Sequence, residues 1–190
     1  MERRFTKKAT DTLNAALRIA GELGHTCIGS EHVLLGILGQ GDSAGAKILA
    51  KQGISYEMML EKVKEHLGSG VKTELSASDM TSRTKAIIQS AAYECTKRGG
   101  AAIGTEHLLF AILLMRDSIA VKLLLAAGCD LASAGNELIE LMKGESGGVG
   151  NGIGEGASDG RTAEAEMETL GKYGKDLTAM AKSGKLDPVI

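Results

Sequence analysis

The sequence predicts an all-α protein: two tandem repeats of four helices each, eight helices in all, followed by a glycine-rich linker and a short helical tail. Two observations carry this prediction. The composition is 43% hydrophobic but only 3% aromatic, with no Trp and one Pro. A core of small aliphatic side chains favours closely packed helices over a sandwich of strands. The chain also matches itself, without a gap, at an offset of 75 residues.

The self-match is clearest where residues 28–38, IGSEHVLLGIL, align with residues 103–113, IGTEHLLFAIL. It continues in both directions, with Thr6 falling on Thr81 and Gly53 on Gly128. Neither repeat alone can bury much apolar surface. We therefore expect the two to pack together as one unit with pseudo-twofold symmetry.

The first two helices of each repeat follow from apolar spacing and stop signals. In the first repeat, apolar residues recur at three- and four-residue steps over about 6–23, and Gly24 supplies a stop. The next helix should begin at Ser30, whose hydroxyl is predicted to be its N-cap, and end near 39–41. The equivalent helices of the second repeat are expected at 81–98 and 105–115.

The remaining helices are shorter. The third should span 43–52 and close at Gly53, a residue that tolerates positive φ. The fourth should stop at Gly68, where a connector rich in Gly, Ser, Thr and Asp begins. In the second repeat the corresponding helices are expected at 118–127 and 131–143.

The composition changes abruptly after Lys143, which divides the chain into domains. Residues 1–143 are predicted to form the double-repeat domain, with the repeats at about 5–67 and 80–142. Residues 144–161 contain too little apolar surface to order themselves and read as a flexible linker. Residues 162–190 regain a thin apolar helical stripe and form a tail that needs a partner.

Charge and targeting signals exclude several function classes. The formal net charge is −2, and no cluster of Lys and Arg interleaves with aromatics, so nucleic acid is not an expected partner. The charged N-terminus is followed by no apolar run long enough for a signal peptide or membrane span. We expect a cytoplasmic protein with no membrane partner.

Sulfur-containing side chains are expected in the core, where small or adaptable apolar groups fill gaps; for the methionines, an adaptable binding surface is the alternative, which their helical spacing disfavours. Three cysteines, far apart and odd in number, offer neither a disulfide framework nor a CxxC motif. The residues concerned are Cys27, Cys95, Cys129, Met58, Met59 and Met142.

One histidine per repeat, His32 or His107, follows the Ser/Thr–Glu pair. Without Cys, Asp or His at ligand spacing nearby, each is expected to be a buried residue hydrogen-bonded to backbone. No metal and no cofactor are predicted.

These motifs resemble the Clp N-terminal repeat, in which each half has a Gly-Thr/Ser-Glu-His-Leu/Ile-Leu stretch that opens a helix. Residues 29–34 and 104–109 both fit, and the opening residues 4–6 resemble ClpC-type members. Residues 173–178 and 184–190 resemble the lead-in to their first AAA+ ATPase module. The resemblance implies a domain that docks substrate and adaptor proteins for the Clp ATPase and protease machinery in quality control and regulated proteolysis.

The same resemblance implies a binding site for phosphorylated arginine. In ClpC-type domains the residues matching Glu31 and Glu106 bind this group, and the residues matching Thr6 and Thr81 lie at the edge of the sites. From the residues alone, a second interpretation stays open. A carboxylate in the first turn of a helix also complements the helix dipole, for a few tenths of a kcal/mol.

Catalysis is not expected. No Gly-Lys pair is followed by the Ser or Thr that a Walker A motif needs, and Ser30 beside His32 is expected to cap a helix rather than act as a nucleophile. The alternative function is a stand-alone regulator that binds the Clp machine or its adaptors. As an isolated domain the chain is expected to be a monomer.

Overall fold

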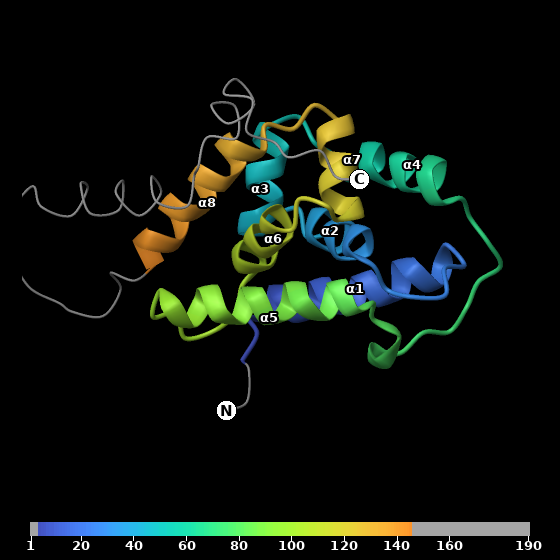
Figure 1. The fold of residues 1–190 in the computed structure, drawn as a ribbon, viewed down its shortest axis with the longest axis horizontal. Helices are drawn as coiled ribbons and strands as arrows, with labels where there is room; N and C mark the ends of the chain where they lie inside the picture. Colours follow the sequence, from blue (N-terminus) through green and yellow to red (C-terminus); the bar gives the residue numbers. More distant parts are fainter. Residues whose placement is uncertain (1–3, 146–190) are drawn as a thin grey trace, which may run out of the picture. The chain divides into compact units, whose positions relative to one another are not determined.

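Residues 4–145 are described by the structure, a computed structural model, and they fold as eight α-helices in two matching sets of four (Figure 1). The first set is α1 (Lys7–Glu22), α2 (Ser30–Gly39), α3 (Ala44–Lys51) and α4 (Tyr56–Leu67). The second is α5 (Ser82–Lys97), α6 (Thr105–Leu114), α7 (Ile119–Ala126) and α8 (Leu131–Glu145). The all-α prediction is confirmed. A short 3-10 turn at Ala77–Asp79, within the connector, was not predicted.

Most helices begin at a hydroxyl that satisfies an amide of the first turn. Thr6 Oγ1 accepts the Ala9 amide at 3.2 Å, and Thr81 Oγ1 accepts the Thr84 amide at 3.1 Å. The glycines that follow α1, α3, α5 and α7 have φ between 72° and 82°, a region that costs other residues free energy. Ser43, Ser55 and Ser118 cap α3, α4 and α7 in the same way as the two threonines.

The central helices α2 and α6 are buried on every side. Nine consecutive residues of each are buried, as expected for helices that other helices surround. Fully buried side chains such as Leu34 and Leu108 belong to one core cluster that both repeats share, and each contributes roughly 1.5–3 kcal/mol. No single helix in residues 4–145 is long and apolar enough to cross a membrane. Only α7 and α8 together reach that length, across a 115° bend.

Two backbone bridges join the repeats reciprocally. Phe5 pairs with Ile103, and Ile28 pairs with Met80, in both cases in parallel. Hydrogen bonds of 2.8 to 3.1 Å hold the two bridges. Each bridge ties the segment before α1 or α5 to the loop before the central helix of the other repeat. The start of one repeat is therefore fixed by the middle of the other.

Two side chains predicted in the core lie at the surface instead. Met58 is 40% exposed because it faces outward in the first turn of α4, whereas Met59, the next residue, is fully buried. Cys27 is exposed because it lies in the loop between α1 and α2 rather than on a packed helix face. Cys95, Cys129 and Met142 are buried as predicted.

The predicted linker and tail fall almost entirely outside the described residues. Helix α8 runs to Glu145, two residues beyond the predicted end of the double-repeat domain. The rest of the predicted linker, and all of the tail at 162–190, lie outside the part of the chain that the structure describes.

Candidate functional site

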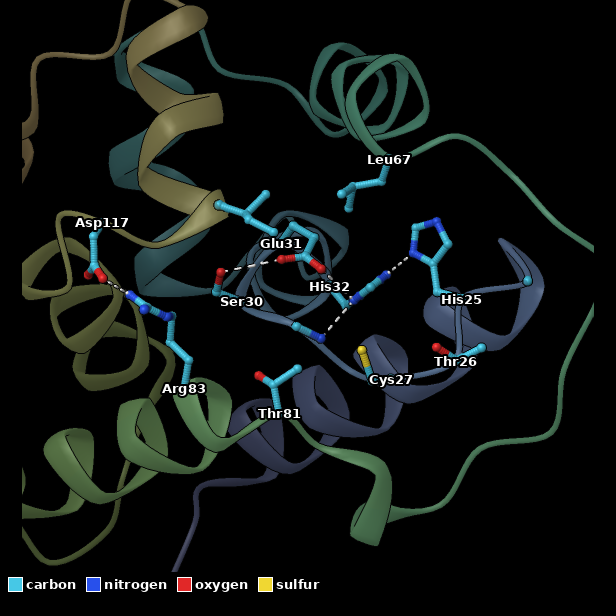
Figure 2. Close-up of a pocket in the computed structure, with 13 residues that line it drawn as sticks. His25, Thr26, Cys27, Ser30, Glu31, His32, Leu67, Thr81, Arg83 and Asp117 are labelled. Atoms are coloured by element: carbon cyan, nitrogen blue, oxygen red, sulfur yellow. Dashed lines mark hydrogen bonds and ion pairs between the residues drawn. The ribbon is translucent and has the colours of Figure 1, made fainter.

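A pocket of about 560 Å³ opens around the start of α2, with Glu31 in its lining (Figure 2). We call it the Glu31 pocket. The first repeat contributes the loop before α2, the first turn of α2 and Leu67, and the second repeat contributes Thr81, Arg83, Asp117 and Ile119. Glu31 therefore shares its pocket with Thr81, a predicted site residue of the other repeat.

A second pocket, of about 600 Å³, surrounds the start of α6, and we call it the Glu106 pocket. Its lining residues are Thr6, Lys7, Lys8, Asp42, Ala44 and Lys47 from the first repeat and Ala102, Thr105, Glu106 and Leu141 from the second. Several of them lie 75 residues from a lining residue of the Glu31 pocket, so the two pockets are pseudo-symmetric. The four predicted site residues thus meet in crossed pairs, Glu31 with Thr81 and Glu106 with Thr6.

Three helices begin at each pocket. Helices α2, α5 and α7 start at the Glu31 pocket, and α6, α1 and α3 start at the Glu106 pocket. The first amides of α7 and α3, at Ile119 and Ala44, donate to no acceptor among the described residues. Free amides at a helix start carry partial positive charge, so both pockets suit an anionic group.

The prediction that Ser30 caps α2 is wrong. The caps are Gly29 and Gly104, whose extended backbone places Ser30 and Thr105 inside the first turn. Each hydroxyl instead accepts an amide from the other repeat. Ser30 Oγ accepts from Ala120 at 3.2 Å, and Thr105 Oγ1 accepts from Gly45 at 3.3 Å. The hydroxyls therefore hold the start of α7 and α3 against the pockets.

The two glutamates are buried against the backbone of their own helix starts. Glu31 is 4% exposed and Glu106 is 7% exposed. Their carboxylates occupy the space that a Cβ atom would fill at Gly29 and Gly104, so no larger residue fits there without displacing them. Each carboxylate also accepts a hydrogen bond from the neighbouring hydroxyl. Ser30 donates to Glu31 at 3.3 Å, and Thr105 donates to Glu106 at 3.5 Å.

The environments of the two carboxylates differ in their effect on ionisation. Burial raises the pKa of Glu31 above its ordinary value, and the hydrogen bonds from its own backbone and from Ser30 only partly offset this. The pKa of Glu106, in contrast, lies below its usual range. Burial acts to raise it, but the hydrogen bonds with His107, with the backbone and with Thr105 together outweigh burial.

The predicted burial and backbone bonding of the histidines is confirmed, with one addition. His32 Nδ1 accepts the Gly29 amide at 2.9 Å, so the ring proton is on Nε2, which donates to His25 Nδ1 at 2.7 Å. His25 Nε2 then donates to the Gly68 carbonyl at 3.2 Å, which completes a relay beside the Glu31 pocket. Burial, and then the nearby His25, lower the pKa of His32 to about 4, so this ring is neutral at neutral pH.

Sequence reasoning missed one ion pair in each pocket. Lys8 Nζ lies 2.7 Å from Asp42 Oδ2, and Arg83 pairs with Asp117 at the equivalent positions. The 75-residue self-match contained the signal, because it aligns both partners of one pair with both partners of the other. Among the described residues, no group of three His, Cys, Asp or Glu side chains is arranged to hold a metal ion.

The geometry agrees with comparisons to known proteins. The profile of the family described as the Clp repeat N-terminal domain matches residues 4–127 and, in a second placement, 79–157. The chain belongs to this family. As in the sequence alone, two copies of the Clp repeat are recognised along one chain.

Relatives of this Clp N-terminal domain include much longer proteins. The chaperone protein ClpC2 of rice chloroplasts (Oryza sativa subsp. japonica) is 33% identical over 190 residues, which is 100% of this chain but 20% of that protein. The chain thus spans about a fifth of the length of the curated relatives it matches.

Solved structures show the same Clp N-terminal fold. The N-terminal domain of the chaperone ClpD from Arabidopsis thaliana superposes with a TM-score of 0.63 at 18% identity, covering 74% of this chain and 95% of that one. A complex of the ClpV N-domain with a VipB peptide superposes with a TM-score of 0.56 at 15% identity, covering 73% and 87%.

Proposed function

We propose that this Clp N-terminal domain docks substrate and adaptor proteins for a Clp-type ATP-dependent unfoldase and that its pockets read phosphorylated arginine. The observation that carries the proposal is the pairing, in each pocket, of a buried carboxylate with the starts of three helices. A group that is cationic at one end and anionic at the other fits this pairing. Phosphorylated arginine is such a group.

The chemistry divides between the two halves of the ligand. The guanidinium nitrogens donate to Glu31 or Glu106, in the charge-assisted geometry that arginine and carboxylates favour. The phosphoryl oxygens accept hydrogen bonds from the free first amides, at Ile119 or Ala44, and from the cationic side chain that lines the same pocket. Thr6 and Thr81 lie at the edge of the same sites.

The role of the whole protein is part of the proposal. A related N-domain has been solved with a peptide bound, which supports peptide capture by this fold. In this proposal, residues 1–190 capture the substrate or adaptor protein. The hydrolysis of ATP belongs to a Clp ATPase ring. A cytoplasmic location and a monomeric isolated domain remain predictions.

Calorimetric titration of the chain with free phosphoarginine tests the proposed ligand. The double variant Glu31→Gln/Glu106→Gln keeps the size of both side chains but removes their charge. We expect it to bind roughly tenfold or more weakly than the wild type. Glu57→Gln is the matched control, because Glu57 is also a first-turn glutamate but is exposed on α4. Equal affinity in the double variant and the wild type would contradict the proposal.

A further inference from the structure

Each of the two pockets contains a buried glutamate, but the pockets differ in whether their threonine can donate a hydrogen bond to a ligand. Thr84 Oγ1 donates its only proton to the Ile28 carbonyl at 2.8 Å, so Thr81 is the donor in the 2.9 Å contact between the Thr81 and Thr84 hydroxyls. Thr81 has no proton left for a ligand. Ala9 stands at the position equivalent to Thr84, and Thr6 therefore keeps its hydroxyl proton while it accepts the Ala9 amide.

The cations around the pockets differ as well. The Lys–Asp and Arg–Asp ion pairs occupy equivalent positions and do not distinguish the pockets. Lys47 and its equivalent Lys122 do not distinguish the pockets either, because each lowers the pKa of the aspartate in its own pocket, Asp42 or Asp117. The Glu106 pocket adds Lys7, which forms no ion pair within residues 4–145. Ser82 stands at the equivalent position, so among the described residues the Glu106 pocket has one unpaired ammonium group that the Glu31 pocket lacks.

The Glu31 pocket has a more apolar wall at two equivalent positions. Ile119 stands where the Glu106 pocket has Ala44, and Cys27 stands where it has Ala102. Each pocket also has one leucine in its lining, Leu67 or Leu141, and both are 38% exposed. Figure 2 shows the Leu67 side chain directed toward Glu31, beside this wall. An apolar side chain next to a bound guanidinium would lose exposed surface against this wall, which stabilises binding.

From these differences we infer that the two pockets take different ligands. The Glu106 pocket binds phosphorylated arginine, and the Glu31 pocket binds unmodified arginine that has an apolar neighbour in the partner protein. The inference rests on the proposed function, because both pockets still hold a guanidinium on their buried carboxylate, and it narrows the recognition of the phosphoryl group to the Glu106 pocket. One domain then reads two features of a partner, a modified arginine and an Arg–apolar pair.

Amide NMR on the ¹⁵N-labelled 190-residue chain tests this assignment with two ligands. They are N-acetyl-Arg-Leu-amide and the same dipeptide phosphorylated on its guanidino group. We expect the unmodified dipeptide to shift the Ile119 amide and to lose binding in Glu31→Gln. The phosphorylated one should shift the Ala44 amide and lose binding in Glu106→Gln.

Exchanging one surface residue between the repeats provides the matched variants. Lys7→Ser should weaken binding of the phosphorylated dipeptide roughly fivefold and leave the unmodified one unaffected. Ser82→Lys should give the Glu31 pocket measurable affinity for the phosphorylated dipeptide. Both positions are exposed at the first residue of α1 or α5, so neither exchange disturbs the core.

The outcomes separate this inference from the proposed function. If the phosphorylated dipeptide shifts both reporter amides with equal affinity, the specialisation is wrong and phosphoarginine recognition stands. If neither dipeptide shifts either amide, both the inference and the proposed ligand fail.

Discussion

At the scale of single residues, the two site carboxylates differ in their contact with the histidine that follows. In both repeats the histidine Nδ1 accepts the amide of the capping glycine, Gly29 or Gly104. His107 Nδ1 lies 2.8 Å from Glu106 Oε1, whereas His32 Nδ1 lies 3.2 Å from Glu31 Oε1. The closer contact contributes to the lowered pKa of Glu106, while burial keeps the pKa of Glu31 raised.

Replacing His25 with glycine, as in the second repeat, should raise the pKa of Glu31 further. His25 lies near enough to favour the ionised carboxylate, and the variant loses that contribution. A carboxylate must be ionised to hold a guanidinium, so the Glu31 pocket of His25→Gly should lose its cation at a higher pH than the wild type. NMR titration of the side-chain carboxyl carbon measures the shift.

Glu106 supplies the internal control for that titration, since its pocket contains no residue altered by the exchange. Its pKa should be the same in both proteins and below that of Glu31 in the wild type. An unchanged Glu31 pKa in His25→Gly would mean that burial alone sets its ionisation.

At the scale of helices, the sequence predicted each α-helix and most of the helix ends, but not the 3-10 turn at Ala77–Asp79. Periodic apolar residues and glycine stops located the helices, because both signals act within one or two turns of chain. The wrong assignment of Ser30 as a cap shows the limit of such local signals. Gly29 and Ser30 both suit a helix start, and the choice depends on the Ala120 amide, which belongs to a helix of the other repeat.

Removing the cap of α7 should weaken one pocket and spare the other. Ser118 is fully buried and accepts the Val121 amide, so Ser118→Ala should lower the free energy of unfolding by about 0.5–2 kcal/mol. It should also loosen the Ile119 amide and reduce binding in the Glu31 pocket alone. Urea unfolding and the two-dipeptide titration measure the two effects.

Ser43→Ala and Ser55→Ala are the comparison variants for this prediction. Ser43 caps α3, so its loss should affect the Glu106 pocket instead. Ser55 caps α4 in the same manner, but it lines neither pocket. A Ser55→Ala variant that loses binding as Ser118→Ala does would show that the effect is global destabilisation.

At the scale of the whole molecule, the crossed pairing of site residues could not be read from the sequence. Self-similarity shows that Thr6 is equivalent to Thr81 and Glu31 to Glu106, but each site could equally have formed within one repeat. What decides the matter is the pair of bridges from Phe5 and Met80 to the opposite repeat, which are long-range contacts. No periodicity or capping signal reports contacts of that kind.

Residues 1–75 and 76–145, expressed separately, should each be largely unfolded and should regain helix when mixed. The core is one cluster shared by both repeats, and each half lacks the backbone partners that the other supplies. Far-UV circular dichroism of each fragment and of the equimolar mixture checks this. A cooperative urea transition of residues 1–75 alone would show that the repeat is an independent folding unit.

The bridges Phe5–Ile103 and Ile28–Met80 are the same contact made twice, in opposite directions. Reciprocal contact of this type is how the two subunits of a twofold homodimer meet, and here both subunits are carried on one chain. In a homodimer every substitution appears at both sites together. On a single chain the halves have separate codons, so a cation can be gained at Lys7 while its counterpart stays Ser82. The fused pair keeps the shared framework of a dimer and lets each of its two sites evolve on its own.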